Sequence, residues 1–259
     1  MPQVSVIVTS YNRQSLLTET LNAILNQTFQ NIEIIVVDAN SNYDFFALIN
    51  SFNNSKIKAF QNENHGIIAT NRNFGLKQVT GRYIAFCDDD DVWLPNKLEQ
   101  QMKVVQNNQV RDEPIIVHTN TILFGDDIKE SVTKKTNITK FDDFFSGNPL
   151  TYSSVLLSNS EWVHFDENPA KRASEDADLW MNLFIKKYNF FLIKKPLVRY
   201  RVATSSESRL NLSFSYIRYI YVVIDAILIF KIKKFSNIKF AILIMKSLFK
   251  FSVRKSQNK

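Results

Sequence analysis

Apolar runs of strand length alternate with segments of helical periodicity in the N-terminal part of the chain. Residues 4–10 and 32–39 are rich in Val and Ile and are bounded by polar turns, the pattern of strands buried on both faces. Residues 57–62 and 82–87 predict two more strands, and helices are predicted at residues 16–25, 43–53 and 67–79, the last closed by Gly81. Strands that alternate with helices predict a parallel sheet covered on both sides.

Polar residues follow three of these strands. SYN follows the first strand at residues 10–12, DANS follows the second at residues 38–41, and four aspartates follow the fourth at residues 88–91. Ligands of parallel α/β sheets bind beyond the carboxyl ends of the strands. We therefore expect the three segments to meet in one crevice.

The aspartates of YIAFCDDDDVW are the strongest chemical signal in the chain. Clustered carboxylates repel one another and raise each other's pKa unless a cation offsets them. Oxygen ligands without Cys or His suit Mg²⁺ or Mn²⁺, so Asp88 and Asp90 are predicted to hold such an ion. The alternative is a solvated turn in which Asp91 caps the helix predicted in VWLPNKLEQQMKVVQ.

A second acidic group occurs in KRASEDADLWMNLF. Glu175 and Asp176 precede apolar residues at helical spacing, so they are expected at a helix N-terminus that Ser174 can cap. A carboxylate placed there can serve as a general base. Asp178 competes with Asp176 for that role. The alternative is that these acidic side chains only stabilise the helix, through their interaction with the positive N-terminal end of its dipole.

The positive charge of the chain is concentrated near its C-terminus. The net charge is +7, yet residues 211–259 hold ten Lys or Arg and one acid, a net charge of +9, which leaves −2 for the rest. A nucleic-acid-binding module needs cations spread over a groove, so a negative body argues against nucleic acid as a partner. Cys87 is the single cysteine, and the N-terminus lacks a signal-peptide pattern, so a reducing, cytoplasmic setting is expected.

The basic C-terminal segment has two apolar stretches. Residues 216–230 are interrupted by Arg218 and Asp225 and are too short to span a bilayer. In a helix over 238–254, four cations form one narrow stripe: Lys239, Lys246, Lys250 and Arg254. The pattern predicts an interfacial helix on an anionic membrane. The alternative is packing against the rest of the protein.

Several motifs in a fixed order resemble one known family. VSVIVTSYNR, LNQTFQNIEIIVVD, NHGIIATNRNFGL, GRYIAFCDDDDVWLPNKLEQQ and SEDADLW together make residues 2–205 similar to family 2 glycosyltransferases of the GT-A fold. The resemblance implies a mostly parallel, Rossmann-like α/β sheet flanked by helices, to which this chain adds a basic helical C-terminal extension. It also implies a nucleotide-diphosphate sugar donor, Mn²⁺ or Mg²⁺, and transfer to an acceptor hydroxyl with inversion.

The resemblance also implies residue roles. The donor is expected to meet the loop after the first strand, with Tyr11 stacking on the base, together with basic and acidic residues elsewhere: Thr9, Tyr11, Asn12, Arg13, Asp38, Arg72, Asp88 and Asp89. Asp88 and Asp90 match the metal-binding Asp-x-Asp element, and Asp176 matches the catalytic base. Two positions depart from the family: Ala39 replaces an acid that contacts uracil, and Ala203 replaces a histidine, which leaves a UDP-sugar favoured but the base uncertain.

These observations predict a glycosyltransferase domain over 1–205 and an amphipathic basic tail over 206–259. Within the domain, residues 1–105 would bind the donor and 106–205 would form the acceptor side, where TYSSVLLS and FFLIKKPLVRYR are expected as strands. The acceptor is expected to be a glycan or a lipid-linked molecule of surface-polysaccharide synthesis, reached at the inner face of the cytoplasmic membrane. A sugar-nucleotide-binding protein without turnover is the main rival interpretation.

Overall fold

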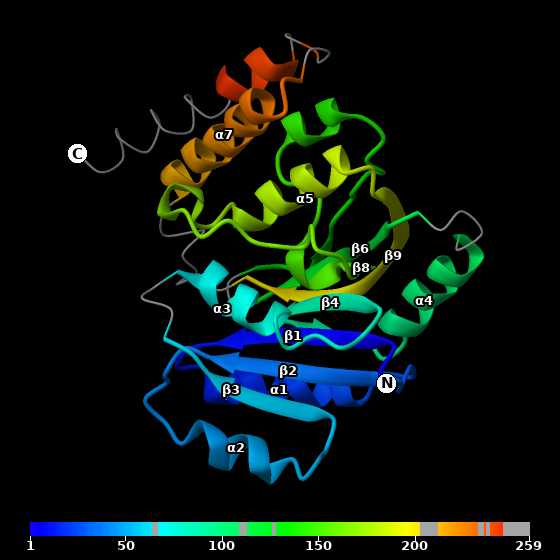
Figure 1. Ribbon diagram of the computed structural model, residues 1–259, viewed down its shortest axis with the longest axis vertical. Helices are drawn as coiled ribbons and strands as arrows, with labels where there is room; N and C mark the ends of the chain where they lie inside the picture. Colours follow the sequence, from blue (N-terminus) through cyan, green and yellow to red (C-terminus); the bar gives the residue numbers. More distant parts are fainter. Residues whose placement is uncertain are drawn as a thin grey trace.

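One mixed sheet with helices on both faces organises the molecule (Figure 1). The computed structural model describes residues 1–63, 67–108, 113–125, 128–202, 212–232, 236 and 239–245. Of the nine strands in the described residues, eight lie in the order β3-β2-β1-β4-β8-β6-β9-β5, and the ninth, β7, pairs with β6 outside that path. The predicted α/β sheet is therefore present.

The first half of the chain forms the parallel part of the sheet. Its elements are β1 (Val4–Ser10), α1 (Gln14–Leu25), β2 (Ile32–Asp38), α2 (Phe45–Ser51), β3 (Ile57–Gln61), α3 (Ile68–Leu76) and β4 (Tyr83–Asp88). β1 pairs in parallel with β2 and with β4, so that Thr9 lies beside both Val37 and Asp88. The carboxyl ends of three strands therefore meet at one edge of the sheet, as the sequence pattern predicts.

The second half contributes mainly antiparallel pairs. Its elements are β5 (Val92–Trp93), α4 (Lys97–Asn108), β6 (Ile115–Phe124), β7 (Ser131–Val132), η2 (Phe141–Ser146), η3 (Tyr152–Ser154), β8 (Leu156–Ser158), η4 (Pro169–Lys171), α5 (Glu175–Ile185), β9 (Asn189–Arg201) and α7 (Leu212–Ile229). β8 runs antiparallel to β4 and β6, whereas β6 and β9 are parallel. The pairing in the sheet thus changes from parallel to antiparallel at β4, the strand that ends at the acidic cluster.

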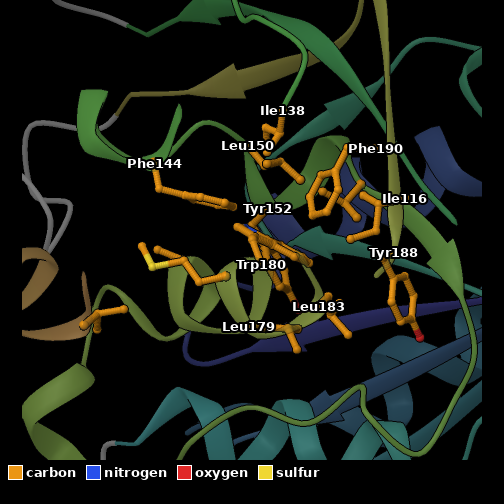
Figure 2. Close-up of a cluster of buried hydrophobic side chains, with 14 of the residues drawn as sticks. Ile116, Ile138, Phe144, Leu150, Tyr152, Leu179, Trp180, Leu183, Tyr188 and Phe190 are labelled. Carbon is orange, nitrogen blue, oxygen red and sulfur yellow. The ribbon is translucent and has the colours of Figure 1, made fainter. Parts of the chain in front are cut away.

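Alternate side chains of the buried strands pack into two separate hydrophobic cores, one on each face of the sheet. In β1, Val6 and Val8 join the core under α1, α2 and α4, and Ile7 joins the core under α3, α5 and α7. The second core is rich in aromatic rings, and Figure 2 shows Trp180 of α5 near Tyr152. Trp180 is fully buried and is therefore a packing residue.

Three local predictions are wrong. Asp91 does not cap a helix, because α4 starts only at Lys97 and the buried Asp91 carboxylate accepts the backbone N–H of Arg201 at 2.9 Å. Gly81 does not close α3, which ends at Leu76. Gly81 instead precedes β4, where a Cβ atom would lie 2.8 Å from the Ser5 backbone nitrogen. TYSSVLLS forms a strand only over its β8 part, and η3 precedes it.

Helix α7 packs on the second core. Val222, Val223 and Ala226 are buried against it, and the hydroxyl of Tyr219 donates to the Phe144 carbonyl at 2.6 Å. Figure 1 shows α7 beside α5 at one end of the molecule. For α7, the packing alternative of the sequence analysis is the one the structure shows.

The rest of the basic segment is described only in part. Residues 239–245 are helical, but Lys246, Lys250 and Arg254 of the predicted basic stripe lie outside the described residues, as does Ala203. Among the described helices, none combines the length and the apolar character required to cross a bilayer.

Candidate active site

The loops after β1 and β2 are joined by hydrogen bonds. Asn12 adopts a left-handed backbone conformation with φ 54°. Its backbone N–H donates to the Ser41 hydroxyl at 2.7 Å, and its side-chain oxygen accepts the Asn42 N–H at 2.7 Å. Tyr11, which precedes it, leaves 58% of its surface exposed. The two loops therefore form one surface from which the Tyr11 ring projects.

Asp38 lies beneath that surface. Its carboxylate is fully buried and accepts both the backbone N–H and the hydroxyl of Ser41, at 2.8 and 2.5 Å. Gln61 of β3 donates to it at 3.2 Å. Asp38, which is predicted to bind the donor, thus lies beneath the loop after β2 and holds it in place. Thr9 is also buried here, and its hydroxyl has no hydrogen-bond partner within the described part of the chain.

The four aspartates after β4 differ in exposure and partners. The side chain of Asp88 is 26% exposed, that of Asp90 is 16% exposed and that of Asp89 is 7% exposed. One guanidinium nitrogen of Arg13 contacts Asp89 at 3.0 Å and Asp90 at 2.9 Å. The structure thus brings Arg13 of the first loop onto the acidic cluster, as the predicted crevice requires.

The cluster holds more negative charge than its cations offset. Burial raises the pKa of Asp88 to about 6, although the neighbouring Arg72 opposes the shift. The pKa values of Asp89 and Asp90 are raised as well, chiefly by burial, with Arg13 acting against it. Carboxylates in this situation gain from binding a further cation.

Arg72 connects the two acidic sites. Its side chain is nearly buried and contacts Glu175 at 2.6 Å and Asp88 at 3.2 Å. Its guanidinium carbon lies 3.8 Å from the centre of the Tyr152 ring. The predicted donor-site arginine is therefore buried and ties the end of β4 to the start of α5.

The sequence pattern places Glu175 at the start of a helix but does not reveal its ion pair with Arg72. It is 5% exposed and pairs with an arginine 103 positions earlier in the chain. A signal was available, since an arginine on an otherwise buried helix face needs a carboxylate partner. Only the folded structure shows which carboxylate pairs with Arg72.

Asp176 and Asp178 have different surroundings on α5. The Asp176 carboxylate accepts the side-chain amide of Asn148 at 2.8 Å, and burial together with Glu175 raises its pKa to about 6. Asp178 contacts the Lys171 ammonium at 2.9 Å, and Lys171 also contacts Asp166 and Asp225 at 2.8 and 2.7 Å. Asp178 is thus used in a charged cluster that fastens α7, whereas Asp176 has no cation within ion-pair distance among the described residues. The geometry favours Asp176 over Asp178 as a base.

Asp88 and Asp90 suit a hard divalent cation that shares its coordination with a substrate. Mg²⁺ is typically held by one or two carboxylates together with substrate phosphates. No group of three or more Asp, Glu, His or Cys residues within the described ranges is arranged to hold an ion by itself. Two partly exposed carboxylates with raised pKa values therefore fit Mg²⁺ or Mn²⁺ bound with a diphosphate.

The sequence profile described as Glycosyl transferase family 2 matches residues 5–145, more than half of the chain. The chain belongs to glycosyltransferase family 2. This glycosyltransferase is 30% identical over 192 residues to the Escherichia coli UDP-Glc:alpha-D-GlcNAc-diphosphoundecaprenol beta-1,3-glucosyltransferase WfaP, with 72% of each protein covered. It is 31% identical over 210 residues to the Campylobacter jejuni GalNAc(5)-diNAcBac-PP-undecaprenol beta-1,3-glucosyltransferase, covering 78% of this chain and 65% of that protein.

Other relatives are matched over less of their length. The glycosyltransferase covers 26% of an uncharacterized Rickettsia bellii glycosyltransferase and 42% of the Escherichia coli glucosyltransferase WfgD.

Solved structures share the fold. Staphylococcus aureus TarS 1–349 in complex with UDP aligns with a TM-score of 0.67 at 19% identity, covering 88% of this chain and 66% of TarS 1–349. The Pyrobaculum calidifontis mannosyltransferase PcManGT in complex with GDP-Man and Mn²⁺ aligns with a TM-score of 0.61 at 16% identity, covering 95% and 69%. The α/β fold that the sequence motifs imply is thereby confirmed, whereas the basic helical extension stays a prediction.

Proposed function

We propose that the protein transfers a sugar from a nucleotide-diphosphate donor to a hydroxyl of a lipid-linked glycan, with inversion at the anomeric carbon. One observation carries the proposal. Arg72 joins Asp88 to Glu175, and Glu175 immediately precedes Asp176. Asp88 of the acidic cluster and Asp176, whose pKa is raised to about 6, are thus linked through buried side chains, which supports their assignment to one site.

The donor would bind on the surface formed by the loops after β1 and β2. The exposed Tyr11 ring offers a stacking face for the base, and Asn12 keeps the two loops together. Asp88 and Asp90 would hold Mn²⁺ or Mg²⁺, which supplies charge neutralisation for the departing diphosphate. Arg13, 41% exposed at its side chain, is placed to bind a phosphate oxygen as well.

Asp176 would act on the acceptor. Its carboxylate would accept the proton of the attacking hydroxyl, which is the task of a general base. A base must be ionised to work, so a pKa of about 6 keeps Asp176 active at neutral pH and lets it titrate just below. A single displacement then inverts the anomeric configuration, and no second carboxylate has to act as nucleophile.

The proposed substrates are a UDP-sugar and an undecaprenol-diphosphate-linked glycan, as in surface-polysaccharide synthesis. The names of WfaP and WfgD specify UDP-Glc and a GlcNAc-diphosphoundecaprenol, and TarS was solved with UDP and with UDP-GlcNAc. The Ala39 departure stands against a strict requirement for uracil. The donor base is therefore part of what the first experiment measures.

The outer face of α7 supports the predicted membrane partner at the cytoplasmic face. Four apolar residues recur at helical spacing along it and remain exposed: Ile217 at 41%, Tyr221 at 40%, Ile224 at 37% and Leu228 at 69%. The inner face of the same helix is buried, so this stripe is fixed relative to the rest of the protein. Together with the +9 charge of residues 211–259, the stripe suits an anionic lipid surface.

The experiment that tests the proposal is calorimetric binding of UDP, GDP and CDP in the presence of Mn²⁺ and in EDTA. We expect tight binding of UDP only with Mn²⁺, and loss of the Mn²⁺-dependent part in Asp90→Ala. Equal affinities with Mn²⁺ and in EDTA for both proteins would contradict the metal site. Metal-dependent binding without any transfer to a GlcNAc-diphospholipid would favour the rival sugar-nucleotide-binding protein.

A further inference from the structure

A short loop brings Asn148 onto the candidate base. The loop leaves η2 through Gly147, whose φ of +111° is costly for residues with a Cβ atom. Asn148 follows it, and its side-chain nitrogen donates to Asp176 at 2.8 Å. Asn148 lies 28 positions before Asp176 and has no part in the sequence motifs.

Two further contacts fix the Asn148 side chain and backbone. Its side-chain oxygen accepts the N–H of Leu150 at 3.3 Å, which orients the amide. Its backbone carbonyl accepts the Lys135 ammonium at 3.1 Å. Leu150 itself is buried in the aromatic core, as Figure 2 shows. The amide therefore presents its donor end to the carboxylate and its acceptor end to its own loop.

We propose that Asn148 is a positioning residue for Asp176, and that its amide fixes the orientation of the carboxylate and keeps it a proton acceptor. The inference rests on the proposed function, in which Asp176 is the base. A neutral donor suits this task because it stabilises the carboxylate without forming an ion pair that would compete with proton uptake.

Other groups around Asp176 act in both directions. Glu175 on the same helix raises the pKa of Asp176, and Arg72 on α3 lowers it, as the Asn148 hydrogen bond also does. Lys135, Tyr200 on β9 and Tyr219 on α7 also interact electrostatically with Asp176. Asn148 is the one partner that donates a side-chain hydrogen bond to Asp176 among those described.

Helix α5 offers a matched control. Asn182 donates its side-chain nitrogen to Asp178 at 3.1 Å, so the helix carries two carboxylates that each accept an asparagine amide. Only the first pair involves the proposed base. Asn182→Ala should therefore leave the titration of Asp176 unchanged.

The experiment follows Asp176 directly by ¹³C NMR of aspartate carboxyl carbons in the full chain, with the signal assigned by its loss in Asp176→Asn. Asn148→Ala should raise the observed pKa by about one pH unit, since a hydrogen bond to a charged group is lost. Asn148→Asp should raise it further, because two adjoining carboxylates share a proton. The acid limb of kcat/KM for transfer from UDP-glucose should move with the titration.

The variants separate electrostatic positioning from loop structure. Asn148→Asp keeps an oxygen that can accept the Leu150 N–H, whereas Asn148→Ala does not. If Asn148 served the loop structure alone, the titration of Asp176 would therefore change more in Asn148→Ala than in Asn148→Asp. That order, or an unchanged Asp176 titration in both variants, would overturn the inference. Retained UDP binding with Mn²⁺ verifies that each variant is folded. Full transfer activity in Asp176→Asn would instead overturn the proposed base, which is a different result.

Discussion

Asp176 and Asp178 show how two carboxylates two residues apart take on different tasks. Asp178 binds the buried Lys171, which opposes the rise that burial causes in its pKa, whereas Asp176 accepts a neutral amide and has a pKa raised to about 6. Both carboxylates are buried, so it is the hydrogen-bonding or ionic partner that distinguishes their roles. The sequence motif favours Asp176, and the surroundings supply the physical reason.

The first prediction compares these two carboxylates. Asp176→Asn keeps the shape and removes the base, so transfer should fall by about 10²- to 10⁴-fold while UDP binding with Mn²⁺ is retained. Asp178→Asn should retain transfer but lower the melting temperature, because Lys171 loses one of its three carboxylates. Steady-state transfer rates and thermal melts of both variants provide the measurement. A transfer defect confined to Asp178→Asn would reverse the assignment.

Among the elements, the sequence predicts best the strands whose side chains are buried on both faces of the sheet. The strands β1, β2 and β4 are buried along nearly their whole length, so their apolar runs identify them. The segment between α3 and β4 makes distant contacts instead, since Thr80 donates its N–H and its hydroxyl to Glu33 at 2.8 and 2.7 Å. The role of Asp91 depends on Arg201 of β9, which lies 110 positions later in the chain. Such boundaries cannot be derived from local periodicity.

The second prediction tests whether α7 belongs to the folded body. Tyr219→Phe removes the hydroxyl that donates to the buried Phe144 carbonyl. The free energy of unfolding should fall by about 1–3 kcal/mol, as expected when a buried acceptor loses its donor. Tyr221→Phe, on the exposed face of the same helix, is the control and should leave stability unchanged. Equal denaturation midpoints for the two variants would contradict this packing.

The third prediction concerns the outer face of α7. Replacing Ile224 and Leu228 by Glu should abolish flotation with phosphatidylglycerol vesicles without lowering the melting temperature, because both side chains are exposed. Phe46→Glu on α2, 46% exposed, removes a comparable apolar group elsewhere and should float like the unmodified protein. High salt should weaken the association, since anionic charge contributes to it. Undiminished flotation of the double variant would exclude this face as the contact.

At the scale of the whole molecule, the sequence predicts the position of the candidate site. It does not predict the contacts that link the residues of that site. Alternating strands and helices place SYN, DANS and the aspartates at one edge, and the contacts of Asn12 with Ser41 and of Arg13 with Asp89 confirm that convergence. The links between the two acidic sites run through Arg72, Glu175 and Asn148. Their partners lie far apart in sequence, so only the folded chain brings them together.

The most direct test of the central claim is the anomeric configuration of a product formed from UDP-glucose and a GlcNAc-diphospholipid in Mn²⁺. ¹H NMR of the purified product reads the configuration of the new linkage. We expect a β-linked glucose, the inverse of the donor configuration, formed by the unmodified protein and not by Asp176→Asn. An α-linked product, or equal product formation by Asp176→Asn, would contradict it.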